Sequence, residues 1–348
     1  MWFIIFLLLL CPHSFAADCR TSDFTSGGTY NCTNLIIDAP LILTGAGGTN
    51  LEINVTGNTE IRADIILNGA SGINVSADTP GGAAAPGGWN GGGLSLGTTQ
   101  DGGEFVNVSV SNGTAGGDDI TCGNGGGGAG FTNAGKNGEL CPTTADPLSR
   151  GVGGSVVPAI EFDFAGAFRG GFGGGAGAFS TPVELGTGGG GGGALHINST
   201  GDVTIISGVT LSAKGGNGGN ALITGGGGGA GSGGAIWIQS TGRISNLGIL
   251  DVRGGTGGKN NSTGAHGGDG GDGAFRLQDS QGVVTGTGVR NFSSGAGSEK
   301  LRSDISCATL LAKKEDSNFA LQLSGAFLLT LLSGLLVKTL YRFPQRNS

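Results

Sequence analysis

The sequence predicts an all-β fold, a right-handed β-solenoid or β-helix-like repeat with packed glycine-rich segments. First, 79 of the 348 residues are glycine, about three times the usual share. Second, the apolar residues form short Ile/Val/Leu/Thr runs between Gly, Asn, Asp and Ser turns, as in a chain of many short strands. Third, a unit of about 40 residues recurs along the chain, which is typical of stacked supersecondary units.

The repeat is clearest where segment 193–219 aligns with segment 234–258. A weaker copy begins at Ala274, and an earlier one covers 51–69. Within each unit apolar residues alternate, which points one side chain inward for every two residues. Strands of three or four residues suit the rungs of a β-solenoid, in which like residues stack. A flatter β-sandwich or prism is the alternative.

The glycine tracts 188–193, 225–229 and 81–93 allow two interpretations. Glycine-rich stretches are commonly flexible linkers. These tracts, however, recur in register with the repeat, just before its Ala-Ile or Ala-Leu strand. Because glycine has no Cβ, they could instead pack as extended, polyproline-II-like strands, at an entropic cost. The sequence leaves both interpretations open.

Both ends of the chain are hydrophobic. The apolar run 2–10 and the small-residue site at Ser14–Ala16 predict a signal peptide over 1–16, although a basic n-region is missing. The uncharged run 319–337 would span roughly 28 Å as a helix, close to the thickness of a bilayer core. The basic residues follow it, so we expect the ectodomain outside and a short tail in the cytosol. The predicted domains are a signal peptide 1–16, an N-terminal cap 17–48, β-solenoid repeats 49–300, a juxtamembrane linker 301–318, a transmembrane helix 319–340 and a basic tail 341–348.

Export leads to an oxidising compartment, in which cysteines are expected to pair. The local pairs are Cys19 with Cys32 and Cys122 with Cys141, each expected to contribute about 3 kcal/mol by loop entropy. Sequence alone does not establish this connectivity. Cys307 is left over, and is free, intermolecular or modified.

The pattern GG-x-GG followed by GGGG-x-GGAI-x-I resembles the glycine-rich β-solenoid proteins of bacterial cell surfaces, such as adhesin and autotransporter passenger segments. The resemblance covers roughly residues 49–290 and implies a presented surface. Cys307, a spacer, an apolar helix and a basic end also resemble the sorting tails of bacterial surface proteins, in which a protease removes the helix. A retained anchor is the alternative.

Little in the chain points to catalysis or cofactors. No GxSxG, HExxH or P-loop motif occurs, and the carboxylate pairs Glu161/Asp163 and Asp118/Asp119 have no base partner at a telling spacing. We therefore predict that the chain is not an enzyme. One GGxGxD turn offers Asp269 and Asp272 as calcium ligands, but such turns bind calcium in tandem, so a solvated turn is the simpler interpretation. We predict no cofactor.

Two further features concern the surface. Nine sequons are candidate glycosylation sites: Asn31, Asn54, Asn74, Asn107, Asn112, Asn198, Asn260, Asn261 and Asn291. Trp237 lies between two inward Ile positions, so it should face outward, where its ring could bind a sugar or a partner or simply cap the surface.

These features predict a membrane-anchored cell-surface structural or adhesion protein. The alternative is a surface-tethered carbohydrate-binding or carbohydrate-active protein. Expected partners are the membrane, through one C-terminal span, and surface glycans or other surface proteins. Nucleic acid is not expected, because the chain carries a net charge of −7 and lacks a basic stripe.

Overall fold

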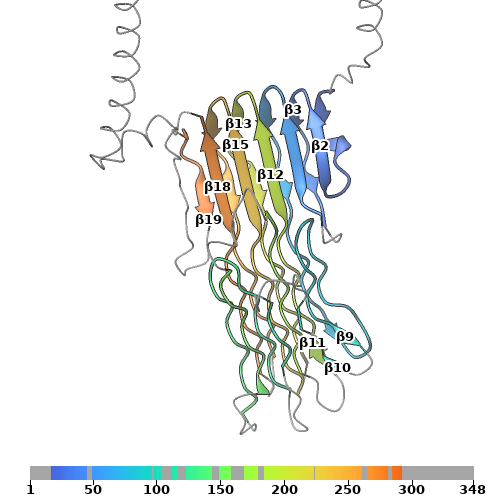
Figure 1. Cartoon of the computed structure of the whole chain (residues 1–348). Helices are drawn as coiled ribbons and strands as arrows, with labels where there is room; N and C mark the ends of the chain where they lie inside the picture. Colours follow the sequence, from blue (N-terminus) through green and yellow to red (C-terminus); the bar gives the residue numbers. More distant parts are fainter. Residues whose placement is uncertain are drawn as a thin grey trace, which may run out of the picture. The chain divides into compact units, whose positions relative to one another are not determined.

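The computed structural model is all-β and dominated by parallel sheets (Figure 1). It describes residues 17–44, 49–95, 98–99, 101–102, 112–116, 123–142, 149–157, 168–178, 184–222, 224–260, 265–280 and 284–291. These residues belong to one compact unit within 1–304.

Three parallel, five-stranded sheets form the upper part of Figure 1. In spatial order, sheet A contains β1 (Cys19–Arg20), β3 (Leu35–Ile37), β6 (Thr59–Ile61), β13 (Val203–Ile205) and β16 (Ile244–Asn246). Sheet B contains β2 (Gly28–Cys32), β5 (Leu51–Val55), β12 (Ala194–Ser199), β15 (Ala235–Ser240) and β18 (Ala274–Asp279). Sheet C contains β4 (Leu41–Ile42), β7 (Ile65–Ile66), β14 (Thr210–Ser212), β17 (Ile249–Asp251) and β19 (Val289–Asn291).

The remaining elements are short. A 3₁₀ turn, η1 (Thr21–Asp23), follows β1. Strand β8 (Asn74–Val75) pairs antiparallel with β11 (Leu185–Gly186), and β9 (Leu94–Ser95) pairs antiparallel with β10 (Thr98–Thr99).

The register of sheet B follows the sequence repeat. Ile197 of β12 is the partner of Ile53 on one side and of Ile238 on the other, and all three side chains are fully buried. Buried and less buried positions alternate along β5 and β12. The apolar side chains therefore face the core, and the polar side chains between them face outward. Like residues therefore stack into a core shared by the three sheets.

The fold class predicted from the sequence, a right-handed β-solenoid with one C-terminal transmembrane helix, is wrong beyond its all-β class. The repeat does not run continuously through 49–300, because none of the described residues between Ile66 and Ala194 belongs to the three sheets. Among the described residues, no helix is long and apolar enough to cross a membrane. The segments 1–16 and 319–340 lie outside the described residues.

The rest of the unit, whose segments alternate along the chain with the strands of the three sheets, is built differently, and we call it the glycine lattice. Its segments are extended but mostly carry no sheet assignment, and they are 67–95, 112–116, 123–142, 149–157, 168–178, 184–193, 213–222, 224–234, 252–260 and 265–273. The lattice forms the lower part of Figure 1, next to the three sheets.

Segment 186–193 shows how the lattice is bonded. The amides of Gly186 and Gly189 donate to Gly226 and Gly229, at 3.0 and 2.9 Å. The amide of the residue that follows each of these donates to a second segment: Thr187 donates to the carbonyl of Ile73, and Gly190 donates to that of Ala70. The third residue of each set, Gly188 or Gly191, donates to a third neighbour, at Gly92 or Trp89. This period of three residues is that of polyproline II.

The carbonyl groups of the same segment accept hydrogen bonds from three further segments. Gly189 accepts from Gly174, Gly190 from Gly216 and Gly191 from Ala85. A single extended segment is thus bonded to six others, namely 67–73, 82–85, 89–92, 171–177, 216–219 and 226–232.

Glycine is required for this spacing. A Cβ at Gly191 would overlap the carbonyl group of Gly171, and one at Gly189 would overlap that of Gly216. Both obstacles are backbone atoms, which cannot rotate away. Of the two interpretations of the glycine tracts, the described residues therefore show the packed one.

Candidate functional site

The outward face of sheet B carries a row of charged and aromatic side chains. The register aligns one residue from each strand, in the order Thr29, Glu52, His196, Trp237 and Arg276. The Thr29 hydroxyl donates to Glu52 Oε2 at 3.3 Å, and the other oxygen of Glu52 lies 3.9 Å from His196 Nδ1. We call these five residues the aromatic row.

Trp237 faces outward, away from the inward Ile236 and Ile238, yet it is only 8% exposed. The His196 ring stacks on it with centroids 4.2 Å apart, and the Arg276 guanidinium lies 5.6 Å from the ring centroid. Phe168 from the glycine lattice packs against both rings. Trp237 also belongs to a buried cluster with Phe131 and Phe172, so its ring surface is used in packing within this unit.

Burial dominates the electrostatics of His196. Loss of hydration lowers the pKa of its imidazole, and this outweighs the opposite effects of the Glu52 charge and the Gln239 hydrogen bond. The folded protein therefore holds the ring neutral at pH values where an exposed histidine would begin to take up a proton.

Acid should destabilise the protein through His196. The unfolded chain takes up a proton near pH 6.5 and the folded chain only at lower pH. The contribution of His196 to the free energy of unfolding is therefore largest above about pH 7, and it decreases as the pH falls toward the pKa of the folded state. Urea titrations at pH 7 and pH 5 should show a smaller loss for His196→Phe, which keeps a stacked ring, than for the wild type. An equal loss in both proteins would contradict this account.

Next to the aromatic row runs a ladder of amide side chains. Asn54 Nδ2 donates to Asn31 Oδ1 at 3.3 Å, Asn198 donates to Asn54 at 3.4 Å, and Gln239 donates to Asn198 at 3.1 Å. Gln278 occupies the same row on β18. The ladder ties neighbouring strands together and accounts for Asn at three of the sequon positions, Asn31, Asn54 and Asn198, without any glycan.

The sequons differ in access. Asn31 and Asn74 are exposed, and Asn54 and Asn198 are partly covered in the ladder. Asn112 and Asn260 are 6% and 5% exposed, and their amides donate to Gly102 and Gly225. Asn291 lies in β19, whereas Asn107 and Asn261 are outside the described residues.

This difference predicts which sequons a eukaryotic secretory pathway could use. Folded, secreted protein should carry glycan on Asn31 and Asn74 and none on Asn112 or Asn260, because a glycan on a buried amide would prevent packing. Glycopeptide mass spectrometry of the secreted protein measures each occupancy, with Asn31→Gln as the control for assignment. Glycan on Asn112 or Asn260 of folded protein would refute the prediction.

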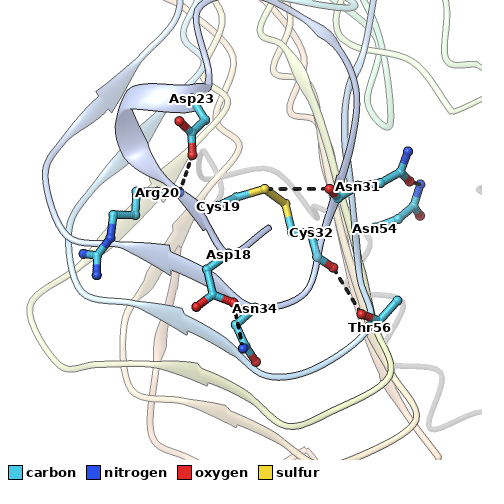
Figure 2. The surroundings of a disulfide bond; sticks show 9 residues. All are labelled: Asp18, Cys19, Arg20, Asp23, Asn31, Cys32, Asn34, Asn54 and Thr56. Atoms are coloured by element: carbon cyan, nitrogen blue, oxygen red, sulfur yellow. Dashed lines mark hydrogen bonds between the residues drawn. A yellow bond between two sulfur atoms is a disulfide. The ribbon is translucent and has the colours of Figure 1, made fainter. Parts of the chain in front are cut away.

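A disulfide joins Cys19 to Cys32, with the two Cα atoms 5.5 Å apart (Figure 2). It links the outermost strands of sheets A and B, where Asp18 accepts a hydrogen bond from Asn34 and the Cys32 carbonyl accepts one from Thr56. Cys141 is also disulfide-bonded. Its predicted partner Cys122, and Cys307, lie outside the described residues.

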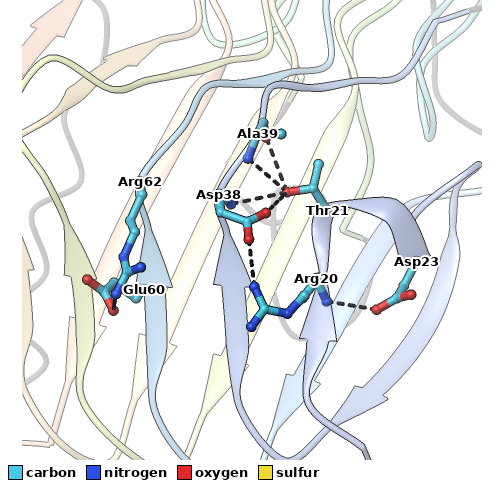
Figure 3. Close-up of polar contacts among 7 residues, drawn as sticks. All are labelled: Arg20, Thr21, Asp23, Asp38, Ala39, Glu60 and Arg62. Atoms are coloured by element: carbon cyan, nitrogen blue, oxygen red, sulfur yellow. Dashed lines mark hydrogen bonds and ion pairs between the residues drawn. The ribbon is translucent and has the colours of Figure 1, made fainter.

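Polar contacts hold the same end of the chain together (Figure 3). Arg20 pairs with Asp38 at 2.7 Å, and Thr21 hydrogen-bonds to Asp38 and Ala39. Nearby, the hydrogen bond and charge of Arg62 lower the pKa of Glu60. These side chains are largely solvated, so we assign them little stability and no chemistry.

The two predicted calcium ligands point to different partners. Asp269 pairs with Lys136 at 2.7 Å; burial raises the pKa of Asp269, but the Lys136 and Gly257 hydrogen bonds outweigh it and lower the pKa overall. Asp272 is 1% exposed and accepts a hydrogen bond from the Gly254 amide. Within the described residues, no group of three or more His, Cys, Asp or Glu could hold a metal ion.

The remaining sequence candidates cannot be placed. Glu161, Asp163, Asp118 and Asp119 lie outside the described residues. The aromatic row was missed at the sequence level, apart from the alignment of Trp237 with His196. The alignment of Glu52 with His196 was available from the same repeat, but Phe168 comes from a segment that shows no repeat.

No protein-family model, curated protein or solved structure matches the chain. The fold defines an all-β protein with three parallel sheets joined to a glycine lattice.

Proposed function

We propose that this chain is a cell-surface structural or adhesion protein in which the glycine lattice is a stiff spacer. The observation that carries the proposal is the bonding of segment 186–193 to six neighbouring segments. Bending or shearing such an array would break hydrogen bonds in several directions at once, because successive residues bond to different neighbours. Ordering so many glycines is costly in conformational entropy, and the hydrogen bonds between the segments offset that cost and make the lattice rigid.

The chemistry of the ends supports a position outside the cell. The apolar run 2–10 is typical of a signal peptide, and the apolar run 319–337 followed by basic residues is typical of a membrane anchor. The disulfide between Cys19 and Cys32 suits an oxidising compartment.

The lattice also offers exposed apolar contact points. Strand β11, labelled in the lower part of Figure 1, pairs with β8. The side chains of Ile73 and Leu222 are 55% and 50% exposed. Asn74 donates to the Asn220 carbonyl, which places these two segments side by side. A protein or glycan on an opposing surface is the expected partner.

Display of the full chain on cells tests the proposal. The wild type should be accessible to external protease and should increase attachment of the cells to a layer of untransfected cells. Gly191→Ala, which disrupts the lattice, should remove the attachment at equal surface amounts, whereas Gly208→Asp should not. Gly208 is a suitable control because nothing lies within 4 Å of the position that its Cβ would take, so Asp there meets no lattice segment and costs only the local strain of a φ of +84°.

Retention of the wild type in the cytosol would overturn the surface location. Attachment that survives lattice disruption would overturn the spacer role.

A further inference from the structure

One hollow in the glycine lattice is lined by charged and polar side chains. Its volume is about 280 Å³, and it lies between segments 133–136, 254–256 and 269–272. The wall combines polar side chains with glycine backbone: Asn133, Lys136, Thr256, Asp269 and Asp272 on one hand, and Ala134, Gly254, Gly255, Gly270 and Gly271 on the other.

The polar groups of the hollow are fixed in place by other bonds. Asp272 Oδ1 accepts from the Gly254 amide at 3.1 Å, and Asp272 Oδ2 accepts from Asn133 Nδ2 at 3.4 Å. Asp269 Oδ1 accepts from the Gly257 amide at 2.9 Å, and its Oδ2 accepts from Lys136 Nζ at 2.7 Å. Each of the two carboxylates therefore accepts two hydrogen bonds from the protein and is held in one position before any ligand arrives.

The charge balance of the wall selects a neutral ligand. Two carboxylates oppose an anion. A cation would have to compete with Lys136 for Asp269, and the described residues around the hollow include no third acidic, histidine or cysteine ligand. A polyhydroxylated ligand fits, because each hydroxyl can both donate to a carboxylate and accept from an amide or ammonium group.

The size of the hollow limits the ligand to a small molecule. Pockets for drug-sized ligands begin at about 300 Å³, so this one suits a single small ring. Ala134 and the glycine methylenes give an apolar surface for the C–H groups of such a ring. We propose that the hollow binds one sugar ring of a neutral saccharide. This goes beyond the spacer role, which does not depend on it.

Saturation-transfer NMR on the purified full chain tests the proposal. The probes are the methyl glycosides of glucose, galactose, mannose and N-acetylglucosamine. At least one should receive saturation from the wild-type protein. Ala134→Trp should abolish the transfer by filling the hollow, and since Ala134 is exposed the fold should survive. Asp269→Asn should weaken binding about tenfold or more, because the Asp269 side chain is 43% exposed and a hydrogen bond from the ligand to this charged acceptor is lost.

Glu60→Gln is the matched control, since it removes a carboxylate that is paired with a cation on sheet A, away from the hollow. It should bind like the wild type. Absence of transfer to all four glycosides, or unchanged transfer to the Ala134→Trp variant, would overturn the proposal. Either result would leave the cell-attachment experiment, and with it the spacer role, unaffected.

Discussion

Replacing Gly191 with alanine is expected to lower the free energy of unfolding by about 3 kcal/mol or more. The new Cβ would overlap backbone atoms of Gly171 and approach the Phe172 amide, so two lattice segments must separate. That movement weakens the hydrogen bonds from Gly191 to Trp89 and from Ala85 to Gly191. The smaller entropy of the unfolded alanine chain opposes this by about 0.4–1 kcal/mol, which is too little to reverse it.

Urea denaturation of the two proteins measures this difference. The control is again Gly208→Asp, which stands in open space and should cost only about 1 kcal/mol, from the strain of an L-residue at a φ of +84°. If Gly191→Ala were as stable as the wild type, segment 186–193 could not be packed against six neighbours.

The second large effect is expected in the core of the three sheets. Ile197→Ala should cost about 2–5 kcal/mol, because Ile197 is fully buried and stacked between Ile53 and Ile238. Its neighbours lie on strands held by hydrogen bonds on both sides and cannot collapse into the cavity.

Thr204→Ala provides the comparison, since Thr204 lies in the outward row of sheet A and is only partly covered. It should change stability by about 0.5 kcal/mol or less. Thermal unfolding by calorimetry would record both variants. Equal midpoints for Ile197→Ala and Thr204→Ala would show that the alternation does not separate core from surface.

The strand-bearing half could be predicted in much of its detail from the sequence. The alternation in 51–55 and 194–199 marks which residues face inward, and the repeat gives the pairing of Ile53 with Ile197. Both signals arise because side chains alternate with a period of two and like residues stack. The error in fold class arose from extending this pattern across 67–193, where the described residues follow a different rule.

That rule is hidden from sequence analysis for a physical reason. Segment 186–193 has a period of three in its hydrogen bonds, but glycine dominates that segment and has no side chain whose variation could reveal the period. Only part of the lining of the hollow could be predicted from the sequence. Asp269 and Asp272 could be singled out, whereas Lys136 and Asn133 come from a segment that no repeat aligns with them.

The central claim is that the glycine tracts form an ordered, hydrogen-bonded lattice, and amide hydrogen exchange tests it most directly. Peptides covering 186–193 and 225–234 should exchange as slowly as the strands β12 and β15, because nearly every amide in them has a backbone acceptor. Exchange of these glycine amides at the rate of an unstructured peptide, with β12 and β15 still protected, would contradict the account.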